Sequence, residues 1–367
     1  MYARKDIGVV IGERYKIKEV ITHHDHEVSV YVATDIQTQE EVALKLNTAV
    51  NKIRRETEFY NDSMRDLEGF PSMRWSWEHE YDDYGDYVYG AIAIDLLGPS
   101  LDTLIEEAEE SKFSLKTTLQ IMDQVITRIQ ALHERHIIHR GIKPDNFCIG
   151  LPGNKTETKV YMIDFDHAKK FRDPETHLHI PYGEDNCIGN PSWASLAVDK
   201  WVEPSRRDDM ESVGYMAVFF LKGCLPWRYW HECPAYPEHR EKKDTTLEYL
   251  CQDLPEELAT YITYCRSLRF DDEPDYDYCR GLFRQAFERA GFKDDGVYDW
   301  AASEIEPDIR ENEPSPGSPQ VSASGGDDTD VETTEDGPSA SQTEVKEACS
   351  TPYMSLRSRQ VVLKIRT

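Results

Sequence analysis

Strand-like and helix-like patterns of apolar residues occupy separate parts of the chain. Tyr15–Val20, Ser29–Thr34 and Glu41–Leu46 are rich in Val, Ile and Tyr, and they partly alternate apolar with polar positions. This composition and period predict three strands. Lys52–Met64 is then predicted to be a short helix, and Tyr87–Leu96 a further strand.

A helical pattern replaces the strand pattern beyond Ser100. Within Leu115–Glu134 the apolar residues recur at roughly helical spacing and form one stripe, made of Leu119, Met122, Val125, Ile126, Ile129 and Leu132. The mostly helical region ends near Trp300. This order of elements predicts an α+β fold in which a small β-rich lobe with one helix precedes a larger, mainly helical lobe.

The last part of the chain differs from both lobes in composition. Residues 303–347 contain 13 acidic residues against two basic ones, are rich in Pro, Ser, Gly and Thr, and have almost no aromatic residues. Such a segment cannot bury enough apolar surface to offset the entropy of ordering. The last 20 residues carry four basic residues and no acidic one. We therefore expect a disordered acidic tail over 303–367 with a basic C-terminal end.

The net charge of the chain makes some classes of binding partner unfavourable. The chain has a formal charge of −27, of which −20 falls on residues 1–302. An acidic body of this kind disfavours nucleic acid and anionic membranes as partners.

The sequence has no run of 18 apolar residues and no apolar N-terminal segment. We therefore expect no membrane span, and a cytoplasmic or nuclear location, or both.

One short segment carries the most specific chemical signal. Residues 139–146 read His-Arg-Gly-Ile-Lys-Pro-Asp-Asn, which resembles the protein kinase catalytic loop H-R-D-x-x-x-x-N at every fixed position except the third. A kinase has there the aspartate that accepts the proton of the substrate hydroxyl. Gly141 has no side chain, so it cannot accept that proton.

Further segments resemble the casein kinase I family of serine/threonine kinases. They follow the family's order along the chain: Leu96–Leu101, Ile163–Phe165, Ala168–Lys170, Arg172–Pro174, His179–Tyr182, Ser205–Asp209, Leu225–Trp227 and Cys265–Phe270. The resemblance runs from about Arg14 to Trp300. It implies a bilobal kinase-like domain over 14–302, with lobes over about 14–95 and 98–302, after an N-terminal extension over 1–13.

Several polar residues match working parts of that family's site. The resemblance implies that Lys45 binds nucleotide phosphate and pairs with Glu56 of the predicted helix. Asn146 and Asp164 match the two magnesium ligands, and both supply the hard oxygen donors that magnesium prefers. Lys143 matches the catalytic-loop lysine that supports the transferred phosphate.

The same resemblance implies a pocket for adenine. Its lining would consist of Ala43, Ile94, Leu97, Cys148 and Ile163. Two interpretations of Cys148 remain open. The thiol either packs beneath the adenine or is reactive, and a reactive thiol needs a lowered pKa.

Three departures from the family's pattern affect catalysis or nucleotide binding. Gly141 removes the general base, and such a loss costs about 10²–10⁴ in rate. The loop over 21–28 has no glycine and contains Asp25 and Glu27, although backbone amides need glycines to approach phosphates closely. Asp166 stands where the family's Asp-Phe-Gly motif has glycine, which adds a second carboxylate beside the predicted metal site.

Residues that hold the fold together are retained. Tyr60, His139 and Phe165 match the internal hydrophobic stack of the kinase fold, and Asp209 matches the aspartate of its central helix. Because the residues that hold the fold together are retained while residues needed for catalysis are missing, the first hypothesis is that the protein is a pseudokinase. It would be a catalytically dead or severely impaired domain that acts as a scaffold or allosteric partner of active kinases or of their substrates.

Other functions remain open at this point. The second hypothesis is a weakly active serine/threonine kinase in which Asp145 or Asp166 replaces the missing base, and the third is another nucleotide-dependent transfer. No cofactor is certain, and residual binding of ATP and magnesium stays open.

A group of aromatic residues either packs in the core or forms a partner-binding hairpin: Trp75, Trp77, Tyr81, Tyr84, Tyr87 and Tyr89.

Overall fold

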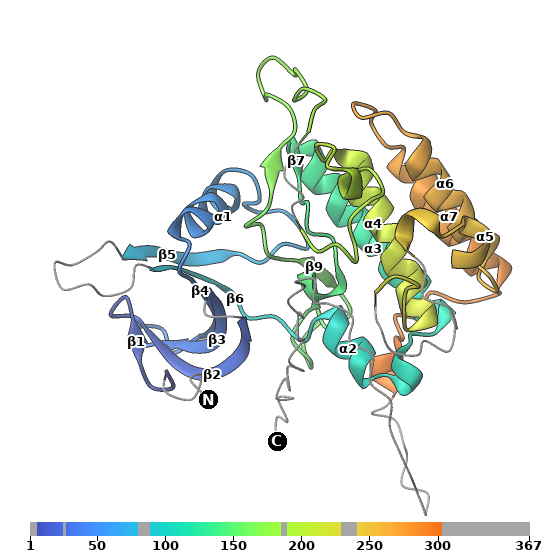
Figure 1. Cartoon of the computed structure of the whole chain (residues 1–367). Helices are drawn as coiled ribbons and strands as arrows, with labels where there is room; N and C mark the ends of the chain where they lie inside the picture. The colour runs from blue at the N-terminus through green and yellow to red at the C-terminus, as the bar shows by residue number, and fades with distance from the viewer. Residues whose placement is uncertain (1–5, 25–26, 80–88, 185–188, 229–240, 303–367) are drawn as a thin grey trace, which may run out of the picture. The chain divides into compact units, whose positions relative to one another are not determined.

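One six-stranded antiparallel sheet and one helix form the small lobe (Figure 1). The computed structural model describes residues 6–24, 27–79, 89–184, 189–228 and 241–302. The strands follow the order β1-β2-β3-β4-β6-β5. Their bounds are β1 Val10–Ile11, β2 Tyr15–His24, β3 Val28–Asp35, β4 Glu41–Asn47, β5 Met73–His79 and β6 Tyr89–Asp95. The helix α1, Val50–Asp62, packs against β4, β5 and β6.

Alternation along the strands explains the core of this lobe. Successive side chains of a strand point to opposite faces of the sheet, so Tyr15 and Ile17 of β2 share one face, as do Val42 and Leu44 of β4. These residues belong to one buried cluster. The partners packed around it include Trp75, Trp77 and Tyr89. The core interpretation of the aromatic group is therefore confirmed for these three residues.

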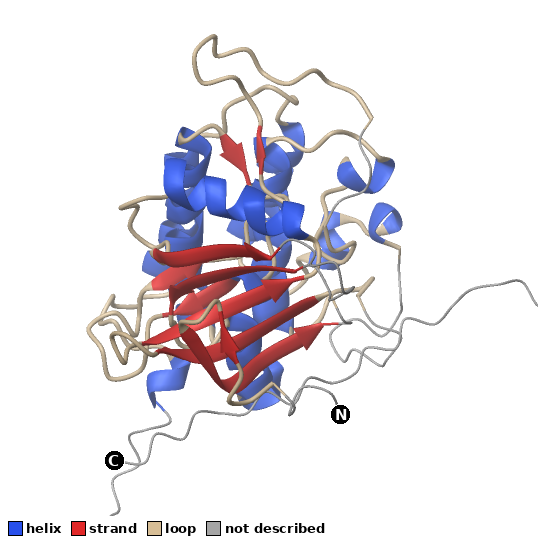
Figure 2. Cartoon of the chain, turned by 90° about the vertical axis from the view of Figure 1, so that its left-hand side faces the viewer, coloured by secondary structure: helices blue, strands red, loops and turns tan. Residues whose placement is uncertain are grey.

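Helices and four short strands form the large lobe, which lies behind the sheet in Figure 2. The helices are α2 Leu101–Glu107, α3 Leu115–Glu134, α4 Arg206–Lys222, α5 Leu247–Leu250, α6 Glu256–Ser267, α7 Tyr276–Arg289 and α8 Asp299–Ala302. The short strands pair as β7 (Ile137–Ile138) with β10 (Lys169–Lys170), and as β8 (Phe147–Ile149) with β9 (Val160–Met162).

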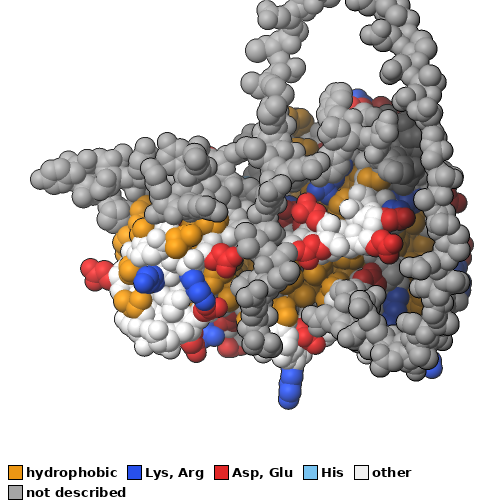
Figure 3. Space-filling model, turned by 90° about the horizontal axis from the view of Figure 1, so that it is seen from below, with side chains coloured by type: hydrophobic (Ala, Val, Ile, Leu, Met, Phe, Trp, Pro, Cys, Tyr) orange, Lys and Arg blue, Asp and Glu red, His pale blue; other side chains and the backbone are white. Residues whose placement is uncertain are grey.

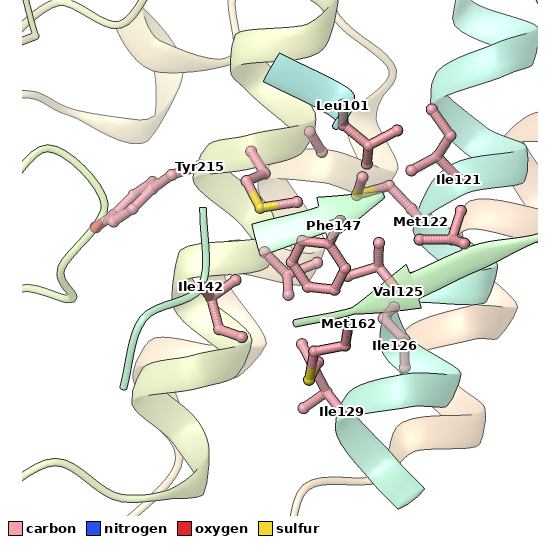
Figure 4. Packing of buried hydrophobic residues seen from close by; sticks show 14 of the residues in the cluster. Leu101, Ile121, Met122, Val125, Ile126, Ile129, Ile142, Phe147, Met162 and Tyr215 are labelled. Atoms are coloured by element: carbon pink, nitrogen blue, oxygen red, sulfur yellow. The ribbon is translucent and has the colours of Figure 1, made fainter. Parts of the chain in front are cut away.

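The helix α3 forms the spine of the large lobe's core. Ser114 caps its first turn by accepting a hydrogen bond from the backbone N–H of Thr117. The predicted apolar stripe is buried along its whole length. Figure 4 shows Phe147 of β8 and Met162 of β9 lying against this stripe. The two strands that follow the predicted catalytic loop, β8 and β9, therefore rest directly on α3.

The predicted elements agree closely with the observed ones. The helix predicted over 52–64 is observed as α1, two residues earlier, and the helix predicted over 115–134 is observed as α3 with the same bounds. The strand β1 falls within the predicted extension 1–13, and its Val10 pairs with Lys16 of β2. The α+β fold of two lobes is confirmed.

Some predictions fall outside the residues that the structure describes. These are the tail over 303–367, the tip of the predicted aromatic hairpin with Tyr81, Tyr84 and Tyr87, and the acidic Asp25 of the glycine-free loop. Across the described ranges, no helix combines the length and the apolar character needed to cross a bilayer.

Candidate functional site

A lysine held between two carboxylates is the centre of the site. Lys45 of β4 lies with its Nζ 2.9 Å from Oε2 of Glu56 and 2.5 Å from Oδ1 of Asp164. Glu56 comes from α1, and Asp164 follows β9 with a left-handed φ of 70°. Three elements far apart in sequence therefore converge here, and the predicted pairing of Lys45 with Glu56 is present.

Burial and charge fix the protonation states of this group. Burial opposes the charge on Lys45, but the carboxylates of Asp164 and Glu56 more than compensate and raise its pKa. Burial also opposes the charge on Asp164, yet Lys45 holds the pKa of that carboxyl below its usual range. The ammonium and the Asp164 carboxylate are therefore both charged at neutral pH.

Asp209 of α4 fixes the backbone that leads into the predicted catalytic loop. Its Oδ2 accepts a hydrogen bond from the N–H of His139 at 2.8 Å, and its Oδ1 accepts one from the N–H of Arg140 at 2.9 Å. His133 of α3 lies 3.0 Å from the same carboxylate. Because Asp209 is buried, these bonds are expected to be strong and to hold the loop rigidly.

Gly141 lies at the position from which a side chain would enter the site. A Cβ added there would lie 3.2 Å from Nδ1 of His139 and 3.4 Å from Nδ2 of Asn146. The same Nδ2 donates a hydrogen bond to the carbonyl oxygen of Gly141 at 2.8 Å. The φ of Gly141 is not among the positive values, so the backbone does not require glycine at this position.

The imidazole of His139 is neutral and oriented. Its Nε2 lies 3.1 Å from the carbonyl oxygen of Ile163, and because a carbonyl only accepts, Nε2 carries the proton. Burial lowers the pKa of His139. Its Nδ1 is buried and has no hydrogen-bond partner among the described residues. The atom nearest to the missing side chain is therefore an enclosed nitrogen lone pair.

Three rings connect the two lobes behind the site. The ring of Phe165 packs edge-on against Tyr60 of α1, with centroids 5.4 Å apart, and against His139, with centroids 5.2 Å apart. The backbone N–H of Phe165 also donates to Oε1 of Glu56 at 3.3 Å. The predicted stack of Tyr60, Phe165 and His139 is thus present, with Asp209 anchoring its lower end.

The two predicted magnesium ligands, Asn146 and Asp164, come from adjacent segments of the chain. The N–H of Ile163 donates to the backbone carbonyl of Asn146 at 3.0 Å, which brings Asn146 next to the segment that carries Asp164. The amide of Asn146 is oriented by its bond to Gly141, so its oxygen is the atom left for a ligand. No group of three or more His, Cys, Asp or Glu suited to a metal occurs in the described part of the chain. Further ligands would have to come from phosphate or water.

The residues predicted to contact adenine occupy the junction of the lobes. Ala43 and Ile94 are paired in β4 and β6, and Leu97 follows in the connecting segment. Ile163 and these three residues are half-buried. The backbone of Cys148 in β8 forms an isolated antiparallel β-bridge with Ser100, the N-cap residue of α2. Burial raises the pKa of Cys148 to about 12, so the packing interpretation is favoured over a reactive thiol.

The described residues of the glycine-free loop belong largely to the sheet. The strand β2 extends to His24, β3 begins at Val28, and these two residues are paired.

Within the predicted catalytic loop, Nζ of Lys143 lies 3.8 Å from Oδ2 of Asp145. The side chain of Asp145 is 42% exposed, so this carboxylate remains open to solvent and to ligands.

Asp166 makes a contact that the sequence did not reveal. Its side chain is 8% exposed and points to α1, where Oδ2 lies 3.8 Å from Nζ of Lys52. Its ion-pair partners are Lys52 and His167, at 3.8 and 3.6 Å, and its charge also acts on Lys45, so the expected place of Asp166 beside the metal site stays a prediction. The spacing of Lys52 and Glu56 (i, i+4) on the predicted helix was the available signal, because such residues share one face.

A cavity among the described residues borders the catalytic loop at Arg140. It has a volume of about 520 Å³ and is formed between α1 and the segment around β10. Its lining includes Arg55, Glu58 and Asp62 of α1 together with Arg140 and Lys170. None of the residues predicted to contact nucleotide or metal lines it.

The sequence matches one described protein family. The model of the protein kinase domain matches residues 26–266, a span that includes Lys45, Glu56, residues 139–146 and Asp164. The match covers well over half of the chain, so it shows the family and the two-lobed fold.

Proposed function

The chain belongs to the protein kinase family, and we propose that it is a pseudokinase of the casein kinase I type. In this proposal the domain is catalytically dead or severely impaired, and it acts in signalling as a scaffold or as an allosteric partner of other proteins. The casein kinase I assignment is supported by the ordered motifs over Leu96–Phe270.

The observation that carries the proposal is the site around Gly141. The backbone there is held by Asp209 and Asn146 as a kinase needs it, and only the carboxylate is missing. The enclosed Nδ1 of His139 is not a substitute, because its surface is covered and a substrate hydroxyl cannot reach it. Transfer then lacks a general base at the position where one acts.

The retained architecture supports a binding role. Lys45 is paired, the ring stack of Tyr60, Phe165 and His139 is complete, and α4 anchors the catalytic loop. These contacts position the two lobes without carrying out chemistry. A domain in this state offers a rigid surface to partners whether or not it turns over nucleotide.

Residual nucleotide binding is part of the proposal. Lys45 would hold a phosphate, and Asp164 with Asn146 would hold magnesium, whose charge would polarise the phosphate oxygens. The half-buried Ala43, Ile94, Leu97 and Ile163, with Cys148, would contact adenine. Affinity should be low, because the hairpin over 21–28 has no glycine whose backbone could approach the phosphates.

A weakly active serine/threonine kinase is the second candidate. Of the two substitute bases considered, Asp145 fits better, since it is exposed and lies beside Lys143. Asp166 fits less well, because its carboxylate is buried and faces Lys52. In this candidate Lys143 would still support the transferred phosphate.

Proteins are the partners that the charge favours. On the face seen from below, acidic side chains group beside apolar ones (Figure 3). Together with the charge of −27, this disfavours nucleic acid and acidic substrates. Active kinases or their substrates are the partners we propose, in the cytoplasm, the nucleus or both.

Complementation separates binding from catalysis. Cells that lack the protein should regain its function with the wild type and equally with Asp164→Asn, which keeps the side-chain size but replaces a negatively charged magnesium ligand with a neutral amide. A folded Asp164→Asn protein that fails to complement would contradict the proposal and favour the weak kinase.

A further inference from the structure

The aspartate at residue 166 has a role that its replacement of glycine does not suggest. We propose that Asp166 is a positioning residue. With Lys52 it forms a latch that holds α1 against the segment after β9 and so presets the Lys45–Glu56 pair. This goes beyond the pseudokinase proposal and does not depend on it.

The Asp166 carboxylate is buried. A buried carboxylate is unfavourable unless a cation or hydrogen-bond donors compensate for its lost hydration. The side chain is 8% exposed, and its Oδ1 accepts no hydrogen bond from the described residues. The compensation must therefore come from charge.

Three basic side chains lie near the Asp166 carboxylate, those of His167, Lys45 and Lys52. His167 lies 3.6 Å from Oδ1 of Asp166, but burial lowers the pKa of that imidazole, so it is mostly neutral at pH 7. Lys45 feels the charge of Asp166, but its ion pairs are with Glu56 and Asp164. Lys52, at 3.8 Å from Oδ2, is thus the cation available to Asp166.

The helix α1 contacts the segment after β9 through two charged residues. Lys52 and Glu56 are four residues apart and project from the same face of the helix. Glu56 binds Lys45 and the N–H of Phe165, while Lys52 binds the next residue of that segment, Asp166. One face of α1 therefore contacts two consecutive residues after β9, Phe165 and Asp166.

The segment that carries Asp166 is hydrogen-bonded to the catalytic loop. The carbonyl of His167 accepts a hydrogen bond from Nε of Arg140 at 2.7 Å, and Arg140 is fixed by Asp209. A continuous path runs from Lys52 through Asp166 and His167 to the loop that contains Gly141. With glycine at residue 166 this path would lose its first link, and Glu56 would be the one charged residue of α1 still bound to this segment.

Hydrogen exchange of α1 in the full chain, without nucleotide, tests the latch. We expect Asp166→Asn and Lys52→Met each to raise the exchange rate of peptides covering Val50–Asp62 by about threefold to tenfold. The double variant should exchange no faster than the faster single variant, because both changes break one interaction. Lys52→Arg, which keeps the charge, should stay close to wild type.

Two results would overturn the latch. One is unchanged α1 exchange in both single variants while the proteins remain folded. The other is a double variant whose effect is the sum of the two singles, which would show that Lys52 and Asp166 act separately. Because no phosphate transfer is measured, neither result bears on whether the protein is a pseudokinase.

Discussion

The amide of Asn146 donates a hydrogen bond to the carbonyl oxygen of Gly141 at 2.8 Å. A predicted magnesium ligand thereby holds in place the one residue of the loop that lacks the expected side chain. The site has kept its geometry around a missing functional group. This relationship makes repair a meaningful experiment, since the backbone does not need to move far.

Repair of the missing base should restore some chemistry. Gly141→Asp should fold, because its Cβ has contacts of 3.2 and 3.4 Å that small shifts of His139 and Asn146 can relieve. With the other parts assembled, we expect phosphate transfer from ATP to rise by about 10²-fold over the wild-type background. Radiolabel transfer to a generic serine/threonine peptide measures this.

Gly141→Asn is the matched control for that repair. It has the same size as the aspartate variant but cannot accept a proton at neutral pH. Equal signals from the two variants would contradict the prediction. They would show that the glycine-free hairpin over 21–28 blocks transfer by itself.

Removal of the central lysine should destabilise the domain. Lys45→Met leaves the carboxylates of Glu56 and Asp164 close together without their cation. Breaking a buried charge pair costs about 3–5 kcal/mol, and because the side chain of Asp164 is 30% exposed we expect about 3 kcal/mol. Urea unfolding measures this difference. Lys45→Arg should lose much less, and a loss below about 1 kcal/mol for Lys45→Met would contradict the account.

The anchor of the catalytic loop should be sensitive to truncation. Asp209→Ala leaves the N–H groups of His139 and Arg140 without their acceptor, and each unsatisfied buried donor costs about 1–3 kcal/mol. We expect a loss of about 3 kcal/mol in the free energy of unfolding. Asp209→Asn keeps one acceptor oxygen and should lose less. Equal losses for the two variants would show that the carboxylate's hydrogen bonds are not what matters.

Mild acid should destabilise the protein through its buried histidines. Burial lowers the pKa of His133 and of His139, so the unfolded chain binds protons that the folded one does not. Stability from these groups is present above the unfolded pKa of about 6.5 and is lost as the pH falls below it. Asp102 and Asp208, whose pKa values burial raises to about 6, partly oppose this.

The net effect between pH 7.5 and 6.0 should be a loss of about 1 kcal/mol. Urea midpoints at the two pH values measure it. A variant with both His133→Gln and His139→Gln should show a flatter dependence, whatever its absolute stability. Stability that rises on acidification of the wild type would contradict the assignment of neutral buried imidazoles.

The sequence predicted most of the fold because its main elements are long and periodic. The stripe of α3 is repeated over several turns, and it was located with correct bounds. The strands β7 and β10 have two residues each, which is too short for any period to be visible. Their pairing depends on contacts between distant segments, so it could not be predicted locally.

The site was predicted by motif, and its contacts only in part. The pairing of Lys45 with Glu56 was expected, and it is present. The burial of Asp166 against Lys52 was not expected, because a departure from a motif reveals which group is lost but not what the new side chain contacts. The orientation of the Asp166 side chain depends on where α1 lies in the folded lobe, and this position cannot be read from a local motif.

Transfer of labelled γ-phosphate from ATP with magnesium is the most direct test of the central claim. Wild type and Asp164→Asn should be compared at equal concentration, with autophosphorylation and peptide phosphorylation both measured. The account predicts that the wild-type signal equals that of Asp164→Asn within error. A wild-type signal clearly above that of Asp164→Asn would contradict the pseudokinase proposal and identify the protein as an active kinase with a rerouted base.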